Sequence, residues 1–214
     1  LPALAAAVIF FGTNAVRLIG LCVVTCLLTE YVITRLRGKP SSLGDLSAVI
    51  TALILAFSLP PGLPSFAVIL GSVFAIAIGK MVFGGLGGNI FNPAMVGRAF
   101  LMSAFPVLMT TWTAPQGLPG ADPSVSAPDA ITTATPLKDL KPLAAGQTRT
   151  LPSAWALFVG RVGGSLGETS ALALLVGGAY LLVRRTIDIA MPVGMIGAVL
   201  IFGGISHLAA PDRF

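Results

Sequence analysis

The uncharged stretch Leu46–Gly79, LSAVITALILAFSLPPGLPSFAVILGSVFAIAIG, decides the fold class. It holds two apolar segments, Leu46–Leu59 and Ser65–Gly79, separated by the proline-rich turn Pro60–Pro64. A helix that crosses the hydrocarbon layer needs about 20 apolar residues. The first segment gives only about 21 Å of helix, so it falls short of a crossing unless its flanks complete it. The stretch therefore predicts membrane-embedded helices that are interrupted.

The composition of the whole chain supports this prediction. Of 214 residues, 55% are hydrophobic and 10% are charged, and the mean hydropathy is +0.93. A soluble domain carries roughly 25% charged residues, so a soluble enzyme, a disordered tail and a disulfide scaffold are excluded. The basic residues behind the net charge of +5 are not gathered in one patch, so the expected partner is the lipid bilayer and no nucleic acid. Cys22 and Cys26 share one helix face, and we interpret them as packing residues.

Working outward from this stretch, the sequence predicts about seven spans in an all-α integral membrane fold. In chain order they are Leu1–Phe11, Thr13–Thr34, Leu46–Leu59, Ser65–Gly79, Pro93–Trp112, Glu168–Val183 and Ile189–Ser206. We expect one transmembrane domain over residues 1–214, a polytopic bundle with broken helices that is incomplete at both ends. Arg17 and Glu30 lie near the ends of the second span, from which their side chains can reach the interface.

The positive-inside rule orients the spans. Six basic residues follow the second, fourth and sixth spans, namely Arg35, Arg37, Lys39, Lys80, Arg184 and Arg185. If the spans alternate in direction, all six fall on the cytoplasmic side. The polar stretch Thr113–Ser153 is then an extracytoplasmic loop.

The glycine-rich break Gly84–Asn92 precedes Pro93, with Asn92 placed as a helix cap. The start of such a half-helix offers positive potential to an anion or to a flavin carbonyl. The alternative interpretation is a tight cytoplasmic turn.

A second glycine-rich entry, Gly160–Ser170, carries Glu168, which we expect just inside the following helix. Glu168 either favours the helix start electrostatically or has a function within the membrane. Arg98 lies about one turn into its span, where it either snorkels or binds a phosphate or carboxylate. The segment Asp129–Leu137 is rich in hydroxyl groups and falls in the long loop.

Together these motifs resemble the RnfD/NqrB family of membrane subunits, and most closely RnfD. The matching segments appear in the family's order and are Asp45–Ala48, Gly84–Arg98, Asp129–Leu137 and Gly163–Leu174. The resemblance implies that Thr135 carries FMN through a phosphoester bond made by a flavin transferase. The residues that fit the pattern recognised by the transferase are Asp129, Thr132, Ala134 and Thr135. Thr133 stands where the family usually has Gly.

The resemblance also implies the fold and the function. The fold would be similar to urea transporters, with two inverted repeats of about five helices, the second one truncated here. The chain would be the membrane subunit of an ion-translocating ferredoxin:NAD oxidoreductase (Rnf) complex in a bacterial inner membrane, with the other Rnf subunits as partners. It would relay electrons through the covalent FMN, with room for a second flavin, and contribute to ion transport. Asn92, Arg98 and Glu168 would contact flavin or take part in coupling, and no catalytic side chain or metal site is expected.

Two alternatives remain open. Broken helices and few intramembrane charges also suit a channel or transporter for a small solute or ion without redox function. A structural membrane anchor would need neither the Asp129–Leu137 segment nor the charged residues.

Overall fold

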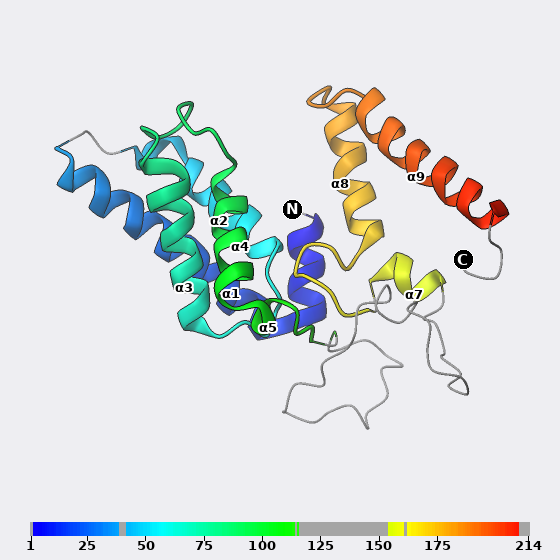
Figure 1. Ribbon diagram of the computed structural model, residues 1–214, viewed down its shortest axis with the longest axis horizontal. Coiled ribbons are helices and arrows are strands. Elements are labelled where there is room, and N and C mark those ends of the chain that lie inside the picture. Colours follow the sequence, from blue (N-terminus) through cyan, green and yellow to red (C-terminus); the bar gives the residue numbers. More distant parts are fainter. Residues whose placement is uncertain (1, 39–41, 114, 116–153, 161, 210–214) are drawn as a thin grey trace. The chain divides into compact units, whose positions relative to one another are not determined.

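The computed structural model describes residues 2–38, 42–113, 115, 154–160 and 162–209. Its first helix, α1 (Pro2–Leu36), bends at Gly12, where φ is 54° and ψ is −130°. Such a left-handed φ is accessible to glycine without the penalty that a Cβ would bring. The predicted break between the first two apolar segments is therefore confirmed, and Figure 1 shows it as a bend in the blue ribbon.

The two apolar segments of the uncharged stretch form short helices, as predicted. A 3-10 turn, η1 (Leu43–Asp45), leads into α2 (Ser47–Phe57), which has only 11 residues. After the proline-rich turn, α3 (Ser65–Phe74) continues into a π-helix, η2 (Ala75–Met81). π-Helical turns are rare in proteins, and those that occur often lie at functional sites. The wider turn changes which side chains of this segment face the protein interior.

The fifth predicted span begins at Pro93, as the sequence indicates, and breaks just before Pro106. Helix α4 (Pro93–Ala104) is followed at Phe105 by the short α5 (Pro106–Met109). Glycines let α4 approach its neighbours closely: a Cβ on Gly97 would lie 2.7 Å from the carbonyl oxygen of Gly71 in α3. Backbones this close fix α4 against α3, as small residues do between membrane helices.

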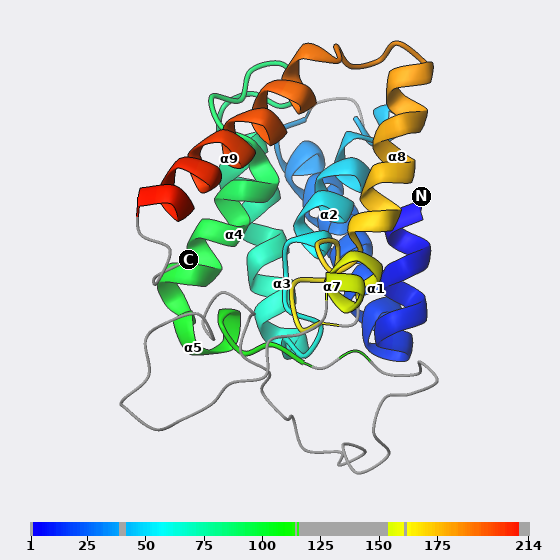
Figure 2. The same ribbon diagram turned by 90° about the vertical axis from the view of Figure 1, so that its right-hand side faces the viewer.

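These helices form the core of one compact unit, Leu1–Ala173. Helix α1 packs against α2 and α3, and α4 packs against α3 and η2. Figure 2 shows α2, α3 and α4 lying side by side in this unit. At one end Arg37 donates a hydrogen bond to the carbonyl of Met81, so the end of α1 and the end of η2 meet there. At the other end a Cβ on Gly62 would lie 2.8 Å from the Oγ1 of Thr113.

Beyond residue 153 the described chain forms α7 (Ala154–Val159) and α8 (Ala171–Val183). The expectation that Glu168 lies just inside this helix is wrong. Residues 166–168 form a turn instead, because the N–H groups of Leu166 and Gly167 bond to Leu59 and Phe57. The helix begins later, where the Oγ of Ser170 accepts the N–H of Ala173 at 3.2 Å.

A second compact unit, Leu174–Phe214, holds the rest of α8 and α9 (Ala190–Ala209). Asp188 begins α9 by accepting the N–H of Ala190 at 3.0 Å. Within the described residues, α1 and α9 are long and apolar enough to cross a membrane, and α2, α3 with η2, and α8 are shorter apolar helices. Two inverted repeats stay a prediction.

Candidate functional site

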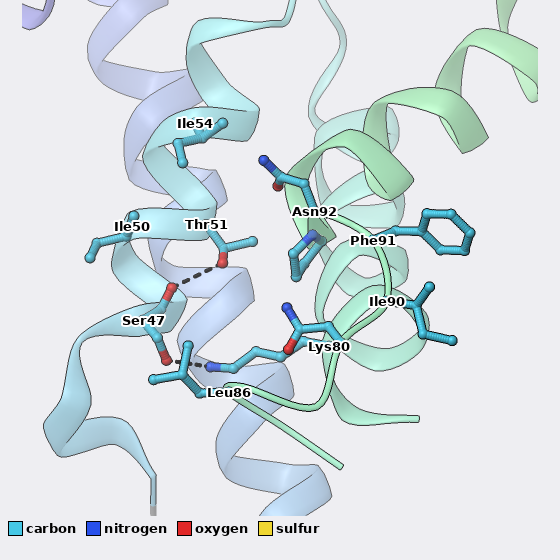
Figure 3. Close-up of a pocket in the computed structure, with 11 residues that line it drawn as sticks. Ser47, Ile50, Thr51, Ile54, Lys80, Leu86, Ile90, Phe91 and Asn92 are labelled. Atoms are coloured by element: carbon cyan, nitrogen blue, oxygen red, sulfur yellow. Dashed lines mark hydrogen bonds between the residues drawn. The ribbon is translucent and has the colours of Figure 1, made fainter. Parts of the chain in front are cut away.

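A pocket of about 440 Å³ lies between α2 and the loop that precedes α4. One wall is α2, with Ser47, Thr51 and two isoleucines, and the other is the chain from Leu86 to Pro93 (Figure 3). Pockets that bind small molecules commonly have 300–1,000 Å³ and apolar walls with a few polar groups. The volume of this pocket lies in that range, and polar and apolar side chains share its walls.

The glycine-rich break shapes the second wall. Gly84, Gly85 and Gly87 all have positive φ, between 86° and 107°, which lets the chain turn back from η2 to α4. Asn92 caps α4 as predicted, because its Oδ1 accepts the N–H of Ala94 at 3.0 Å. The amide nitrogen of Asn92 points towards α2 in Figure 3. The pocket therefore lies at the positively polarised start of a 12-residue helix.

One polar atom of this wall has no partner in the described structure. The Oδ1 of Asn89 is buried and accepts no hydrogen bond. A buried acceptor without a donor costs about 1–3 kcal/mol, so a ligand with an N–H or O–H group is favoured here. Asn89 is a site residue that the sequence analysis did not single out.

Lys80, which lines the pocket, belongs to a buried ion pair. The Nζ of Lys80 donates to both oxygens of Glu30, at 2.8 and 2.9 Å, and to the Oγ of Ser47. Ser42 donates a further hydrogen bond to Glu30. Lys80 is 2% exposed and Glu30 is fully buried, so the pair joins η2 to α1 in the protein interior.

This pair corrects the expectation that Glu30 reaches the membrane interface. It also removes Lys80 from the charges that can face lipid headgroups, although Lys80 lies at the same end of the unit as Arg37. An ionisable residue inside an apolar segment is by default a candidate for function, with its partner nearby. Applied to Glu30 and Lys80 together, this rule could have identified them from the sequence as a candidate site.

Outside the pocket, Asp45 fixes the start of α2. Its Oδ1 accepts the backbone N–H of Ser47 at 2.8 Å and also accepts the hydroxyl of Ser47. These hydrogen bonds to the charged form hold the pKa of the exposed Asp45 below its usual value of 3.8. Asp45 thus orients the serine that accepts from Lys80.

The structure brings two of the predicted site residues together. The Nη1 of Arg98, in α4, lies 3.8 Å from the Oε1 of Glu168, with side chains 29% and 61% exposed. Asn92 lies at the start of the same helix and does not join them. A partly exposed pair at this distance contributes at most about 1 kcal/mol, so we regard it as a polar bridge rather than a major source of stability.

The connection that carries Glu168 docks on the end of α2. The N–H of Gly167 donates to the carbonyl of Phe57 at 2.9 Å, and that of Leu166 donates to Leu59 at 3.1 Å. These bonds satisfy carbonyls that a helix leaves unpaired at its end. A Cβ on Gly167 would lie 2.6 Å from the Cβ of Phe57, so glycine is required for the approach.

The predicted flavin segment lies outside the described residues. This applies to Asp129, Thr132, Thr133 and Thr135. Cys22 and Cys26 are buried in the core as free thiols, in line with their interpretation as packing residues.

In the part of the chain that the structure describes, the apolar, interrupted helices define the class as a helical membrane protein. The chain belongs to the NQR2, RnfD, RnfE family, whose pattern it matches over residues 1–213.

Several curated relatives are similar to this chain in sequence. The chain is 41% identical over 222 residues to the D component of the proton-translocating ferredoxin:NAD(+) oxidoreductase complex of Clostridium ljungdahlii, covering 99% of this chain and 64% of that protein. It is 44% identical over 204 residues to the D component of the Na(+)-translocating ferredoxin:NAD(+) oxidoreductase complex of Acetobacterium woodii, covering 94% and 60%. The D component of the ion-translocating oxidoreductase complex of Halorhodospira halophila is 39% identical over 233 residues, covering 100% and 65%. The chain thus spans less than two-thirds of the length of these relatives.

Proposed function

We propose that this chain is the RnfD-type membrane component of an ion-translocating ferredoxin:NAD oxidoreductase complex in a bacterial inner membrane. The observation that carries the proposal is the identity of 41% and 44% to two proteins named as components of such complexes, over nearly all of this chain. The partners are then the other subunits of the complex, and ion transport is coupled to electron transfer through them.

The cofactor of the proposed subunit is FMN, bound covalently to Thr135 by a flavin transferase. Asp129, Thr132 and Thr133 belong to the segment that the enzyme recognises. A bound flavin supplies one- and two-electron transfer, while the protein supplies its position and electrostatic surroundings. The side chains of the segment break no bonds in the electron relay.

Two contacts support an extracytoplasmic position for this loop. Thr113 lies beside Gly62 in the turn between α2 and α3. Leu166 and Gly167 dock on the adjoining end of α2. Both flanks of the loop therefore lie at the end of the unit opposite Arg37, and the positive-inside rule assigns the Arg37 end to the cytoplasm.

The pocket beside α4 is the proposed place for the second, non-covalent flavin. The orphaned Oδ1 of Asn89 matches the ring N–H of a flavin, and the start of α4 suits the carbonyls that flank this N–H. The three N–H bonds of Lys80 are all directed to Glu30 and Ser47, so the ammonium group holds its place without a ligand. Arg98 and Glu168 are proposed to support coupling, since their bridge joins α4 to the connection that follows the flavin loop.

Mass spectrometry of the full-length subunit tests the covalent flavin. The subunit is coexpressed with its flavin transferase and denatured, and we expect the FMN mass increment and flavin fluorescence on the wild type. Thr135→Val removes both, whereas the matched control Thr150→Val, in the same loop but outside the motif, keeps them.

An increment that survives Thr135→Val, or that never appears on the wild type, contradicts the assignment. A colourless protein that conducts a small solute in liposomes would instead support the channel alternative.

A further inference from the structure

We infer that the buried Lys80–Glu30 pair sets the reduction potential of the ring bound in the pocket beside α4, with the two charges acting in opposite directions. The inference rests on the proposed occupancy of this pocket by a flavin. It adds a role for two residues that lie outside the flavin motif and outside the loop.

The pair is an oriented dipole. Lys80 and its acceptor Ser47 line the pocket, whereas Glu30 is not among the lining residues. Because the Nζ of Lys80 donates to the Oγ of Ser47, which lines the pocket, we place the ammonium group nearer to the bound ring than the carboxylate. Figure 3 shows the side chain of Lys80 reaching across the end of the pocket towards Ser47.

The orientation of this dipole is held from both ends. Two oxygens of Glu30 accept from Lys80, and Ser42 donates to Glu30 from the connection before α2. Ser47 is held by Asp45, which accepts its backbone N–H at 2.8 Å. A dipole that is fixed before electron transfer needs no rearrangement when charge arrives.

Burial makes this dipole effective. Lys80 is 2% exposed and Glu30 is fully buried, and charges away from water are screened far less than surface charges. A flavin bound in this pocket would supply electron transfer, and reduction would bring negative charge beside Lys80 while the hydrogen bonds of the ion pair stay as they are. The nearer ammonium group stabilises that negative charge more than the carboxylate destabilises it, so the intact pair raises the reduction potential.

Spectroelectrochemistry of the full-length subunit tests this inference. Thr135→Val serves as the background, so that the flavin retained in the pocket is the only one titrated, and electrons come from an electrode through mediators. Lys80→Met should lower the midpoint potential and Glu30→Gln should raise it. The double variant leaves no unpaired charge, and its potential should lie below that of the background protein.

Arg35→Gln is the matched control. Arg35 lies five residues after Glu30 on the same helix, but it is exposed, so water screens its charge and the potential should not move.

Three outcomes would overturn the inference. Shifts of the same sign in both single variants would indicate a general loss of structure. A double variant at or above the background potential excludes the dipole, and this result stands even where the single variants do not fold. A folded double variant that retains no flavin would show that the pair binds the ring rather than tunes it.

The proposed function fails in a different way. A background protein without any flavin in the pocket would remove both the proposed occupancy and the inference. If the pocket retains flavin but the midpoint potentials of the variants do not shift as expected, only the inference fails.

Discussion

Replacing Gly167 by alanine should detach the connection before α8 from the end of α2. The added Cβ would lie 2.6 Å from the Cβ of Phe57 and 3.2 Å from its carbonyl oxygen. The first distance is too short for two carbon atoms, and Phe57 belongs to a helix that cannot shift freely. Overpacking of this kind costs about 1–3 kcal/mol.

The strain also acts on two hydrogen bonds. The N–H groups of Leu166 and Gly167 donate to Leu59 and Phe57, and each bond contributes about 1 kcal/mol. The overpacking and the two bonds together amount to about 1–5 kcal/mol. With about 2–4 °C lost per kcal/mol in a domain of this size, we expect the melting temperature in detergent to fall by about 2–20 °C. Hydrogen exchange of a peptide covering residues 162–170 should speed up before the rest of the unit opens.

Gly164→Ala is the matched control in the same connection. A Cβ there would lie 3.4 Å from the Cγ2 of Thr169, which needs at most a small adjustment, so both measurements should stay near the wild-type values. Equal effects of the two substitutions, or unchanged exchange in Gly167→Ala, would refute the reasoning from the contact with Phe57.

Three further predictions concern the pocket and its supports. Lys80→Met should destabilise the unit by about 3–5 kcal/mol because it leaves the carboxylate of Glu30 buried and unpaired. Adding Glu30→Gln should recover part of this loss of stability. A double variant that is less stable than both single variants in thermal unfolding would argue against the pair. Asn92→Ala should cost about 1 kcal/mol through the lost cap of α4, whereas Asn92→Asp should keep most of it, as compared by melting temperature. Hydrogen bonds to Ser47 lower the pKa of Asp45 in the folded state from its usual value of 3.8. Its contribution to stability is therefore present above this usual value and is lost as the pH falls through the lower folded pKa. Asp45→Asn should flatten the acid side of the stability profile below about pH 5, and an unchanged profile would exclude this role.

The hydrogen bonds of Lys80 make the pocket end of the unit rigid. The ion pair joins α1 to η2, and Ser47 joins Lys80 to the start of α2. The same end carries the pocket, whereas the flanks of the predicted flavin loop lie at the opposite end. In the proposed function, α4 therefore runs from the pocket towards the loop, and a rigid helix keeps the two places at a constant separation.

The local signals in the sequence determined the positions of the breaks. Gly12, the turn Pro60–Pro64 and Pro106 each act through their own backbone: glycine accepts a positive φ, and proline cannot continue a hydrogen-bonded helix. The cap at Asn92 was predictable for the same reason, because a cap involves residues only two or three positions apart. Composition likewise sufficed for the membrane class.

Only the tertiary structure decided which charges meet. Glu30 and Lys80 are 50 residues apart. Their local sequence does not predict that the π-helix containing Lys80 brings its side chain to Glu30. The start of α8 at Ala171 rather than at Glu168 has the same origin. The preceding backbone bonds to α2, and such bonds between distant segments outweigh the weak local preference for helix.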